Sequence, residues 1–342
     1  MNGFQGHFLF AHSSFTIFND HTMKTFFSCD WGTSAFRLRL VDAESGKVLF
    51  SVKTPYGISA AFNDWKQANQ PEENRIAFYQ AYLFDEVKKI TASFNDSFDN
   101  VPLILSGMAS SSIGMMELPY KELPFLCNGS DLIIHTLRGE DLPYKIIMIS
   151  GAKSAVDVIR GEETILAGCH VHDKDNQQLF IFPGTHSKHI TVQNGAAQSI
   201  TSYMTGELFE LLSKKSVLSA SVKKNDPEQN LNNYHFVEGV NKGITLNLMN
   251  SIFHVRTNQL FKKLTPLENY HYLSGLLIGH ELKDVAENNP GNITLVCSEG
   301  LKNEYIQALD TLGLGSRLYY ENADHALVNG HLKIMQQPGK KT

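Results

Sequence analysis

Two short glycine-containing turns carry the residue types that bind phosphate and a metal ion. In the first turn, an apolar run stops at Asp30 and is followed by Gly32, Thr33 and Ser34. The second turn contains Gly184, Thr185, His186 and Lys188. Successive backbone N–H groups in such a turn form a concave anion site, to which hydroxyl and ammonium groups add donors. An acid beside the turn, here Asp30, can hold Mg²⁺ through water.

Each turn also has a simpler interpretation, because small polar residues around a glycine are common in β-turns. Two such turns about 150 residues apart favour a nucleotide site over two unrelated turns. The sequence has no GxxxxGK[ST] motif and no GxGxxG after a strand, so neither a P-loop nor a dinucleotide fold is indicated. We expect no metal site from His186 and His189, because strand alternation places them on opposite faces.

Three acidic residues before the second turn could accept a proton. They are Asp157, Glu162 and Glu163, in the sequence DVIRGEET. A carboxylate that takes a hydroxyl proton in the transition state contributes about 10²–10⁴-fold to a rate. On a helix, neighbouring residues project about 100° apart, so only one of Glu162 and Glu163 can face a given point. The alternative for the other is an ion pair with Arg160.

The elements that must position these residues alternate between strands and helices. Residues 24–30, 35–42 and 47–54 predict an antiparallel meander around the first turn. Apolar spacing predicts a helix over 72–94. Further strands are expected at 101–106, 131–137 and 144–150, followed by a helix over 155–170.

The same opening pattern recurs in the second half of the chain. Residues 178–203 read as strand, turn, strand, an Asn194-Gly195 hairpin and strand, and a helix follows from Glu207. Thr205 could cap this helix or face a ligand. The remaining expected elements are helices at 232–252, 268–287, 300–312 and from 323, and strands at 292–297 and 315–320.

Length and composition indicate a globular protein of two domains. The chain has 342 residues and a net charge of −5, which argues against a nucleic-acid binder that neutralises phosphates. Its four cysteines are far apart, which favours a reducing cytoplasm over a disulfide framework or structural zinc. No apolar run is long enough to span a bilayer. We expect a disordered extension over 1–22, an N-terminal lobe over 23–155 and a C-terminal lobe over 156–342, with the last helix packing back near the hinge.

These motifs resemble those of the actin, sugar-kinase and heat-shock-chaperone ATPase superfamily. Its phosphate motifs D-x-G-T-[ST] and G-T-x-x-K are similar to residues 30–34 and 184–188. Its adenosine motif resembles residues 293–309, in which Ser298, Gly300 and Asn303 take the motif positions. The resemblance implies a two-lobed α/β fold, ribonuclease H-like, in which each lobe is a mixed sheet flanked by helices.

Within that superfamily, the chain resembles the 2-dehydro-3-deoxygalactonokinase family. The matching segments are DWGTSAFRLRL, SGMASSSIGMMELPYKELP, DVIRGEET, PGTHSK, TGEL and LSGLLIGHE, in order over residues 30–281. In the last of these, Gly275 and Gly279 share one helical face and would pack against a neighbouring helix or the adenine ring.

The substrate of that family is a sugar acid, and the resemblance implies where it binds. Arginine suits a planar carboxylate, and Arg37 is the expected partner, although Arg39 shares its strand face. The loop 107–114 follows a strand end, where ligands of α/β proteins bind, unless it is a flexible surface loop. The expected substrate residues are Arg37, Ser106, Gly107, Met108, Ser111 and Arg160.

The resemblance therefore implies an ATP- and Mg²⁺-dependent kinase that phosphorylates the C6 hydroxyl of 2-dehydro-3-deoxy-D-galactonate in galactonate breakdown. Its expected partner is this small molecule, with no nucleic acid and no membrane, and a homodimer is compatible with the sequence. One alternative is a non-catalytic protein that senses a sugar acid and ATP, against which the acidic pair and both turns argue. The other is a phosphatase of the same fold, which would not need a sugar-acid loop.

Overall fold

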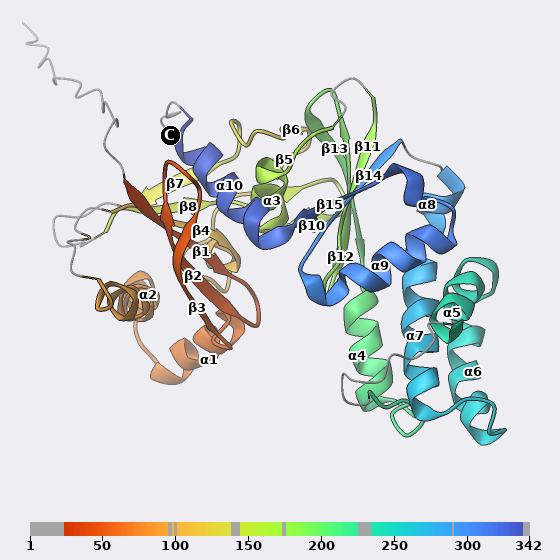
Figure 1. Cartoon of the computed structure of the whole chain (residues 1–342). Helices are drawn as coiled ribbons and strands as arrows, with labels where there is room; N and C mark the ends of the chain where they lie inside the picture. The colour runs from red at the N-terminus through yellow and green to blue at the C-terminus, as the bar shows by residue number, and fades with distance from the viewer. Residues whose placement is uncertain are drawn as a thin grey trace, which may run out of the picture.

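The computed structural model describes residues 24–94, 98, 101–137, 144–172, 176–224, 234–288 and 291–337. The expected extension over 1–22 lies outside the described residues. Two lobes, each built on a six-stranded sheet, lie side by side (Figure 1). The helices α3 (Glu162–Gly168) and α10 (Ala323–Met335) lie between the two sheets.

The first sheet has the strand order β3-β2-β1-β4-β8-β7. Its strands β1, β2 and β3 form the predicted antiparallel meander, and β4 and β8 continue the sheet parallel to β1. The bounds are β1 Thr25–Trp31, β2 Phe36–Asp42, β3 Val48–Thr54, β4 Leu103–Gly107, β7 Ile134–Leu137 and β8 Ile146–Ile149. Helices α1 (Ile58–Ala68) and α2 (Arg75–Thr91) pack on its outer face.

The second sheet repeats this arrangement, with the order β15-β14-β11-β12-β13-β6. Its meander is β11-β12-β13, and β14 and β15 lie parallel to β11. The edge strand β6 comes from the first half of the chain and pairs with β13. The bounds are β6 Phe125–Leu126, β11 Gln178–Phe182, β12 Ser187–Gln193, β13 Ala196–Tyr203, β14 Asn292–Cys297 and β15 Leu318–Asn322. The predicted two-lobed fold with duplicated mixed sheets is thus confirmed.

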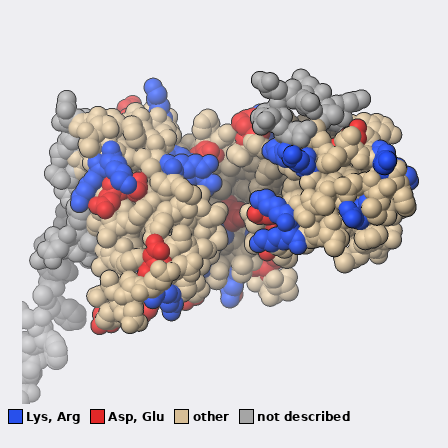
Figure 2. Space-filling view, turned by 90° about the horizontal axis from the view of Figure 1, so that it is seen from below, with Lys and Arg blue, Asp and Glu red and all other residues tan. Residues whose placement is uncertain are grey.

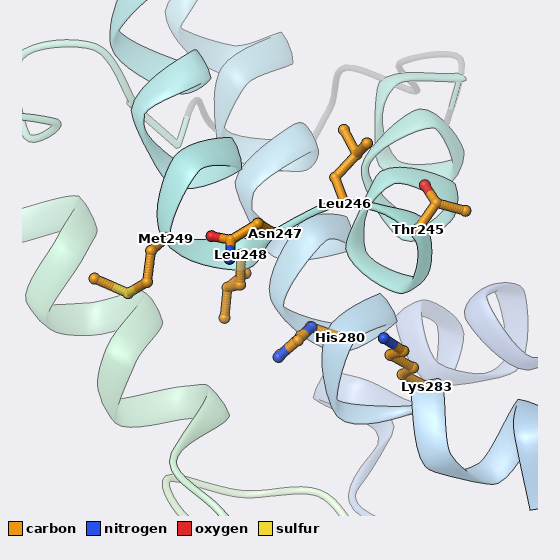
Figure 3. Close-up of a pocket in the computed structure, with 7 residues that line it drawn as sticks. All are labelled: Thr245, Leu246, Asn247, Leu248, Met249, His280 and Lys283. Carbon is orange, nitrogen blue, oxygen red and sulfur yellow. The ribbon is translucent and has the colours of Figure 1, made fainter.

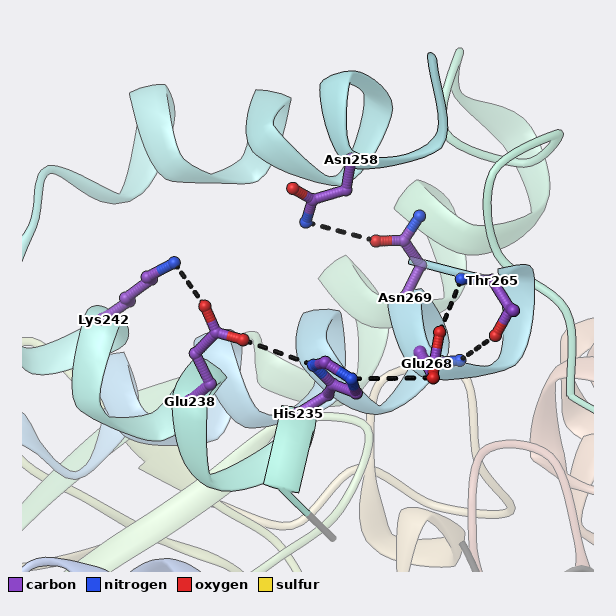
Figure 4. A network of polar contacts seen from close by, with 7 residues as sticks. All are labelled: His235, Glu238, Lys242, Asn258, Thr265, Glu268 and Asn269. Carbon is purple, nitrogen blue, oxygen red and sulfur yellow. Dashed lines mark hydrogen bonds and ion pairs between the residues drawn. The ribbon is translucent and has the colours of Figure 1, made fainter. Parts of the chain in front are cut away.

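The helices of the second lobe form a group below and beside its sheet (Figure 1). They are α4 Thr205–Lys215, α5 Tyr234–Thr245, α6 Leu248–Leu260, α7 Pro266–Glu281, α8 Lys283–Asn288 and α9 Glu299–Thr311. Helix α7 begins where the sequence dictates, because Thr265 and Glu268 form a reciprocal capping box and Pro266 occupies the first turn. The same Glu268 faces His235 of α5, whose ring also contacts Glu238 (Figure 4).

One predicted helix is shorter than expected. The sequence pattern predicts a helix over 155–170, but Val158–Ile159 (β10) pairs with Ala152–Lys153 (β9) and, through β9, joins Lys121–Glu122 (β5). The Ser154 hydroxyl accepts the Asp157 N–H at 2.9 Å and closes the hairpin. Gly161, with a φ of +116°, then starts α3. A local hairpin and a left-handed glycine therefore replace the first turns of the expected helix.

Hydrophobic core clusters lie on both faces of the first sheet. In β1, Phe26 and Phe27 point to opposite sides, Phe26 into a cluster shared with α3, α10 and the second sheet. Phe27 points into the cluster beneath α1 and α2. The central cluster contains residues of both sheets, so α3 and α10 connect the lobes.

Helix α10 is attached to the first sheet by polar contacts as well. His331 is fully buried, and its ring nitrogens contact the Ser28 hydroxyl at 2.8 Å and the Ser106 hydroxyl at 3.0 Å. Near the start of the helix, Asp324 pairs with the buried Arg39. Arg39, which shares the strand face of Arg37, thus ties α10 to β2.

We expect the stability of the fold to depend on pH through His331. Burial, reinforced by the Arg39 guanidinium, lowers the pKa of His331 to about 3. In the unfolded chain the imidazole takes up a proton near pH 6.5, so its contribution is present above that pH and is lost as pH falls toward 3. The expected loss is at most about 1.4 kcal/mol per pH unit. Urea unfolding at several pH values measures it, and His331→Gln, which stays neutral, should show a shallower slope. Equal slopes would contradict this assignment.

Candidate active site

The first turn is exposed and is fixed from behind by the start of α1. The Gly32 N–H donates to the Ala35 carbonyl at 2.9 Å, and the side chains of Thr33 and Ser34 are exposed. The N–H groups of Ile58 and Ser59 donate to the carbonyls of Gly32 and Thr33, respectively. These contacts require Gly57 before the helix, since a Cβ there would lie 2.5 Å from the Ser34 Cα.

The second turn is fixed in the same way by the start of α4. The Glu207 N–H donates to the Thr185 carbonyl at 2.9 Å. A Cβ at Gly206 would lie 2.8 Å from the Thr185 Cα and closer still to the Gly184 carbonyl oxygen. Gly57 and Gly206 are therefore equivalent residues of the two halves, and both allow a helix to begin directly behind a phosphate turn.

Charged groups accompany the second turn. The Lys188 side chain is buried, and its Nζ donates to the His186 carbonyl at 3.0 Å. Among the described residues, Lys188 has no carboxylate partner. The His186 ring is exposed and contacts Glu207 at 2.5 Å. An ammonium group with no carboxylate partner among the described residues suits an anion.

Both turns lie on the same side of the molecule. Helices α1 and α4, whose first residues contact the turns, are at the lower edge of Figure 1. Figure 2 views the molecule from this edge and shows a hollow between the two lobes, with charged side chains along its walls. The two predicted phosphate turns thus belong to different lobes, and the helices that fix them lie at the same edge of the molecule.

Asp30 lies at the end of β1 and pairs with Arg37 on β2. The Arg37 Nη1 to Asp30 Oδ2 distance is 2.7 Å, and both side chains are partly exposed. The second carboxylate oxygen faces Gly107 at the end of β4, where a Cβ would lie 3.0 Å from Oδ1. Gly107 has a φ of +81°, which glycine adopts readily. Arg37 is therefore engaged with Asp30 through its Nη1.

The acidic pair lies next to this position. A Cβ built on Gly161 would lie 3.5 Å from the Gly107 Cα, so the start of α3 lies against the end of β4. Glu163 is fully buried, and both of its carboxylate oxygens accept the Gly161 N–H, at 2.8 and 3.0 Å. Burial, followed by the nearby Glu162 carboxylate, raises the pKa of Glu163 to about 7.

The other acidic candidates are more accessible. Glu162 is half-buried, and its Oε2 accepts the Arg160 backbone N–H at 3.0 Å. The expected side-chain ion pair with Arg160 is absent between these described residues. Asp157 is also half-buried. Burial and then Asp284 raise the pKa of the Tyr203 phenol on β13 to about 12, and the nearby Asp157 adds to this shift.

Arg160 forms a small cluster with the predicted substrate loop. Its Nη1 donates to the Ser110 hydroxyl at 2.7 Å and to the Ser110 carbonyl, and its guanidinium lies 4.2 Å from the centre of the Tyr120 ring. The Arg160 Nε is buried without an acceptor among the described residues. Ser111 is buried and donates to the Met108 carbonyl at 2.7 Å, so the predicted loop is ordered rather than flexible.

Several predicted residues lie elsewhere or have structural contacts. Ser106 is buried and bonded to His331, on the α10 side of the sheet. Gly275 and Gly279 pack against α5, with the Val240 Cα 2.7 Å from a Cβ at Gly279. Ser298, Gly300 and Asn303 are exposed at the start of α9, with open space around Gly300. Thr205 is inside α4 rather than its cap, which is Met204.

A cavity of about 560 Å³ among the described residues is lined by none of the predicted site residues. It lies at the junction of α5, α6 and the end of α7, and its lining includes Asn247, His280 and Lys283 (Figure 3). The sequence analysis missed Gly57, Gly206 and Tyr120 as site residues. The signal for Gly206 was its position in the TGEL motif, directly after the strand that follows the second turn.

Comparisons with known proteins give a consistent result. The profile of the 2-keto-3-deoxy-galactonokinase family matches residues 30–334. A Rhizobium meliloti (strain 1021) protein with the provisional name 2-dehydro-3-deoxygalactonokinase is 28% identical over 312 residues, 88% of this chain and 93% of that protein. The 2-dehydro-3-deoxygalactonokinase of Escherichia coli (strain K12) is 30% identical over 224 residues, 63% and 72% of the two chains. A crystal structure from Sinorhizobium meliloti with the same provisional name has a TM-score of 0.75 at 26% identity, covering 93% and 98%.

Proposed function

The chain belongs to the 2-keto-3-deoxy-galactonokinase family, and on that premise we propose that it transfers the γ-phosphoryl group of ATP to the C6 hydroxyl of 2-dehydro-3-deoxy-D-galactonate. The observation that carries this proposal is the pair of equivalent turns, each fixed by the start of a helix, with both helices at the same edge of the molecule (Figure 1). Such a pair can hold a polyphosphate from two sides. Phosphoryl transfer depends mainly on positioning and charge stabilisation, which this arrangement supplies.

We assign the phosphate groups to the backbone N–H groups of the two turns and to Lys188. The described residues contain no cluster of three or more potential metal ligands. A Mg²⁺ ion bound mainly by phosphate and water needs no such cluster, and Asp30 beside the exposed first turn fits this requirement. When bound there, Mg²⁺ would neutralise charge that develops on the transferred group. Arg37 holds the Asp30 carboxylate in place by its 2.7 Å ion pair.

We assign the role of general base to Glu162. It is half-buried, and among the described residues only one of its carboxylate oxygens has a protein donor. Glu163 is fully buried and uses its carboxylate to hold Gly161, which lies against Gly107 and hence against Asp30. Glu163 thus positions the loop, while Glu162 is available for the sugar hydroxyl.

For the carboxylate of the sugar acid we propose Arg160 in place of the predicted Arg37. The Nη1 of Arg37 is engaged by Asp30, whereas the Nε of Arg160 has no acceptor among the described residues. Tyr120 stacks on this guanidinium and Ser110 orients it, so the group is held for planar recognition. The loop 107–114 then contributes hydroxyl and backbone groups to the sugar.

A coupled ADP-release assay with Mg-ATP over a panel of 2-keto-3-deoxy sugar acids tests the proposal. We expect turnover with the galacto-configured acid, and mass spectrometry should find the new phosphate on C6. Folded protein that releases no ADP with any sugar acid would contradict the kinase assignment. ADP release without a sugar acid would favour a phosphatase.

The role of Arg160 leads to a separate prediction. Arg160→Lys keeps the charge but loses the fork, so we expect the KM for the sugar acid to rise about tenfold or more, with the KM for ATP unchanged. The preference for the acid over its methyl ester should fall at the same time. Arg75→Lys is the control, because Arg75 bonds the carbonyl of Gly114 in the same loop but belongs to α2 and is not assigned to the substrate. An unchanged preference in Arg160→Lys would rule out this role.

The lobe boundary, the partner, the cellular location and the oligomeric state are also part of the proposal. We place the boundary between the lobes near residue 155, and we propose a small-molecule partner and cytoplasmic function. Among the described residues, none of the helices combines the length and apolarity needed to cross a membrane. A homodimer stays a prediction, which the mass of the protein in solution would test.

A further inference from the structure

A buried carboxylate joins the segments around the second phosphate turn. Glu281, the last residue of α7, is 2% exposed and accepts hydrogen bonds on both oxygens. Its Oε1 faces the His189 Nε2 at 3.1 Å, and its Oε2 accepts the Tyr305 hydroxyl at 2.8 Å and the Thr205 hydroxyl. The Ser187 hydroxyl contacts the Tyr305 hydroxyl at 3.1 Å. Four segments that are distant in the sequence therefore meet at one side chain.

Each of these segments carries part of the candidate nucleotide site. Ser187 and His189 flank Lys188 on β12, and because strand residues alternate, they point away from the face that Lys188 occupies. Thr205 directly precedes Gly206, which lies against Gly184. Tyr305 is on α9, the helix that begins at the predicted adenosine residues. Glu281 thus contacts the turn from behind, while Lys188 and the backbone N–H groups remain available in front.

Resting on the proposed function, we propose that Glu281 is a positioning residue that sets the second phosphate turn relative to the adenosine helix α9 and so determines nucleotide affinity. A buried carboxylate with three donors is costly to disturb, because removing the acceptor leaves the donors unpaired. The three donors come from β12, α4 and α9, so their relative placement depends on this one group. Neither phosphate contact nor proton transfer is assigned to it.

The test measures MgADP binding by calorimetry without any sugar acid. Tyr305→Phe disconnects α9 and Glu281→Gln removes the charge, each with nearly unchanged shape. We expect either variant to weaken MgADP binding about tenfold and to raise the KM for ATP, with the KM for the sugar acid unchanged. Tyr272→Phe is the matched control, because this tyrosine of α7 is equally buried but its hydroxyl takes no part in the contacts of Glu281.

The outcomes separate this inference from the proposed function. Loss of thermal stability in Tyr305→Phe with unchanged MgADP affinity would overturn the inference, as would an equal rise in both KM values. Should Glu281→Gln fail to fold, Tyr305→Phe alone decides. A wild-type protein that binds MgADP but phosphorylates no sugar acid would contradict the proposed function. The MgADP affinity of each variant relative to the wild type would then still decide the positioning role. Absence of MgADP binding in the wild type would overturn both.

Discussion

Replacing Glu162 by glutamine is expected to lower kcat by about 10²–10⁴-fold, the usual contribution of a general base. Glutamine preserves the shape of the side chain and can still accept the Arg160 N–H, so the start of α3 should keep its place. The KM values for ATP and the sugar acid should change little, because the lost interaction belongs to the transition state. Steady-state kinetics with both substrates measures the effect.

The matched variants are Glu163→Gln and Asp157→Asn. Both carboxylate oxygens of Glu163 accept the Gly161 N–H, so Glu163→Gln should weaken the hold on Gly161. We expect this variant to raise both KM values and to lower the stability of the fold, with only a small loss of kcat. In Glu162→Gln, the pKa of Glu163 should also fall from about 7 toward its ordinary value, because one of the two causes that raise it is removed. Full activity in Glu162→Gln together with a large loss in either matched variant would transfer the role of base to that residue.

A methyl group at Gly206 should impair nucleotide binding strongly. In Gly206→Ala the new Cβ would lie 2.8 Å from the Thr185 Cα, so the second turn must move away from the helix. Misplacement of a binding group by about 1 Å can cost about 10²-fold. We therefore expect the KM for ATP to rise between tenfold and a hundredfold, while the KM for the sugar acid stays within about twofold. Gly57→Ala should have the same effect through the first turn, because its Cβ would lie 2.5 Å from the Ser34 Cα.

Lys215→Ala on the exposed end of α4 is the control for Gly206→Ala, because it changes the same helix away from the turn. Circular dichroism and thermal unfolding establish that each variant is folded. Unchanged ATP kinetics in both glycine variants would show that close contact between helix and turn has no bearing on the nucleotide.

The strands and most helices follow from local sequence signals. The Asn194-Gly195 hairpin has positive φ at both residues, as its composition predicts, and the capping box at Thr265 fixes the start of α7. The hairpin at 152–159 was missed because its closing contact, Ser154 to Asp157, is also compatible with the start of a helix. Local patterns therefore predict which helices and strands form better than they predict where each one ends.

The site was less predictable, because its contacts join distant segments. Ser106 appeared available to substrate, but its hydroxyl faces His331, which lies 225 positions later in the chain. Arg37 lies directly opposite Asp30 in the antiparallel register, so their pairing could have been derived from the length of the turn. Nothing local to Glu281 indicates its three partners, because they become neighbours only when the helices pack on the second sheet.

The central claim is that the two turns hold one nucleotide between the lobes. The most direct measurement is a crystal structure with Mg²⁺ and a non-hydrolysable ATP analogue. We predict that the phosphate groups contact backbone N–H groups of both residues 33–34 and residues 184–186, with the metal ion on the Asp30 side. A nucleotide bound to only one of the turns, or bound elsewhere with both turns in solvent, would contradict the account.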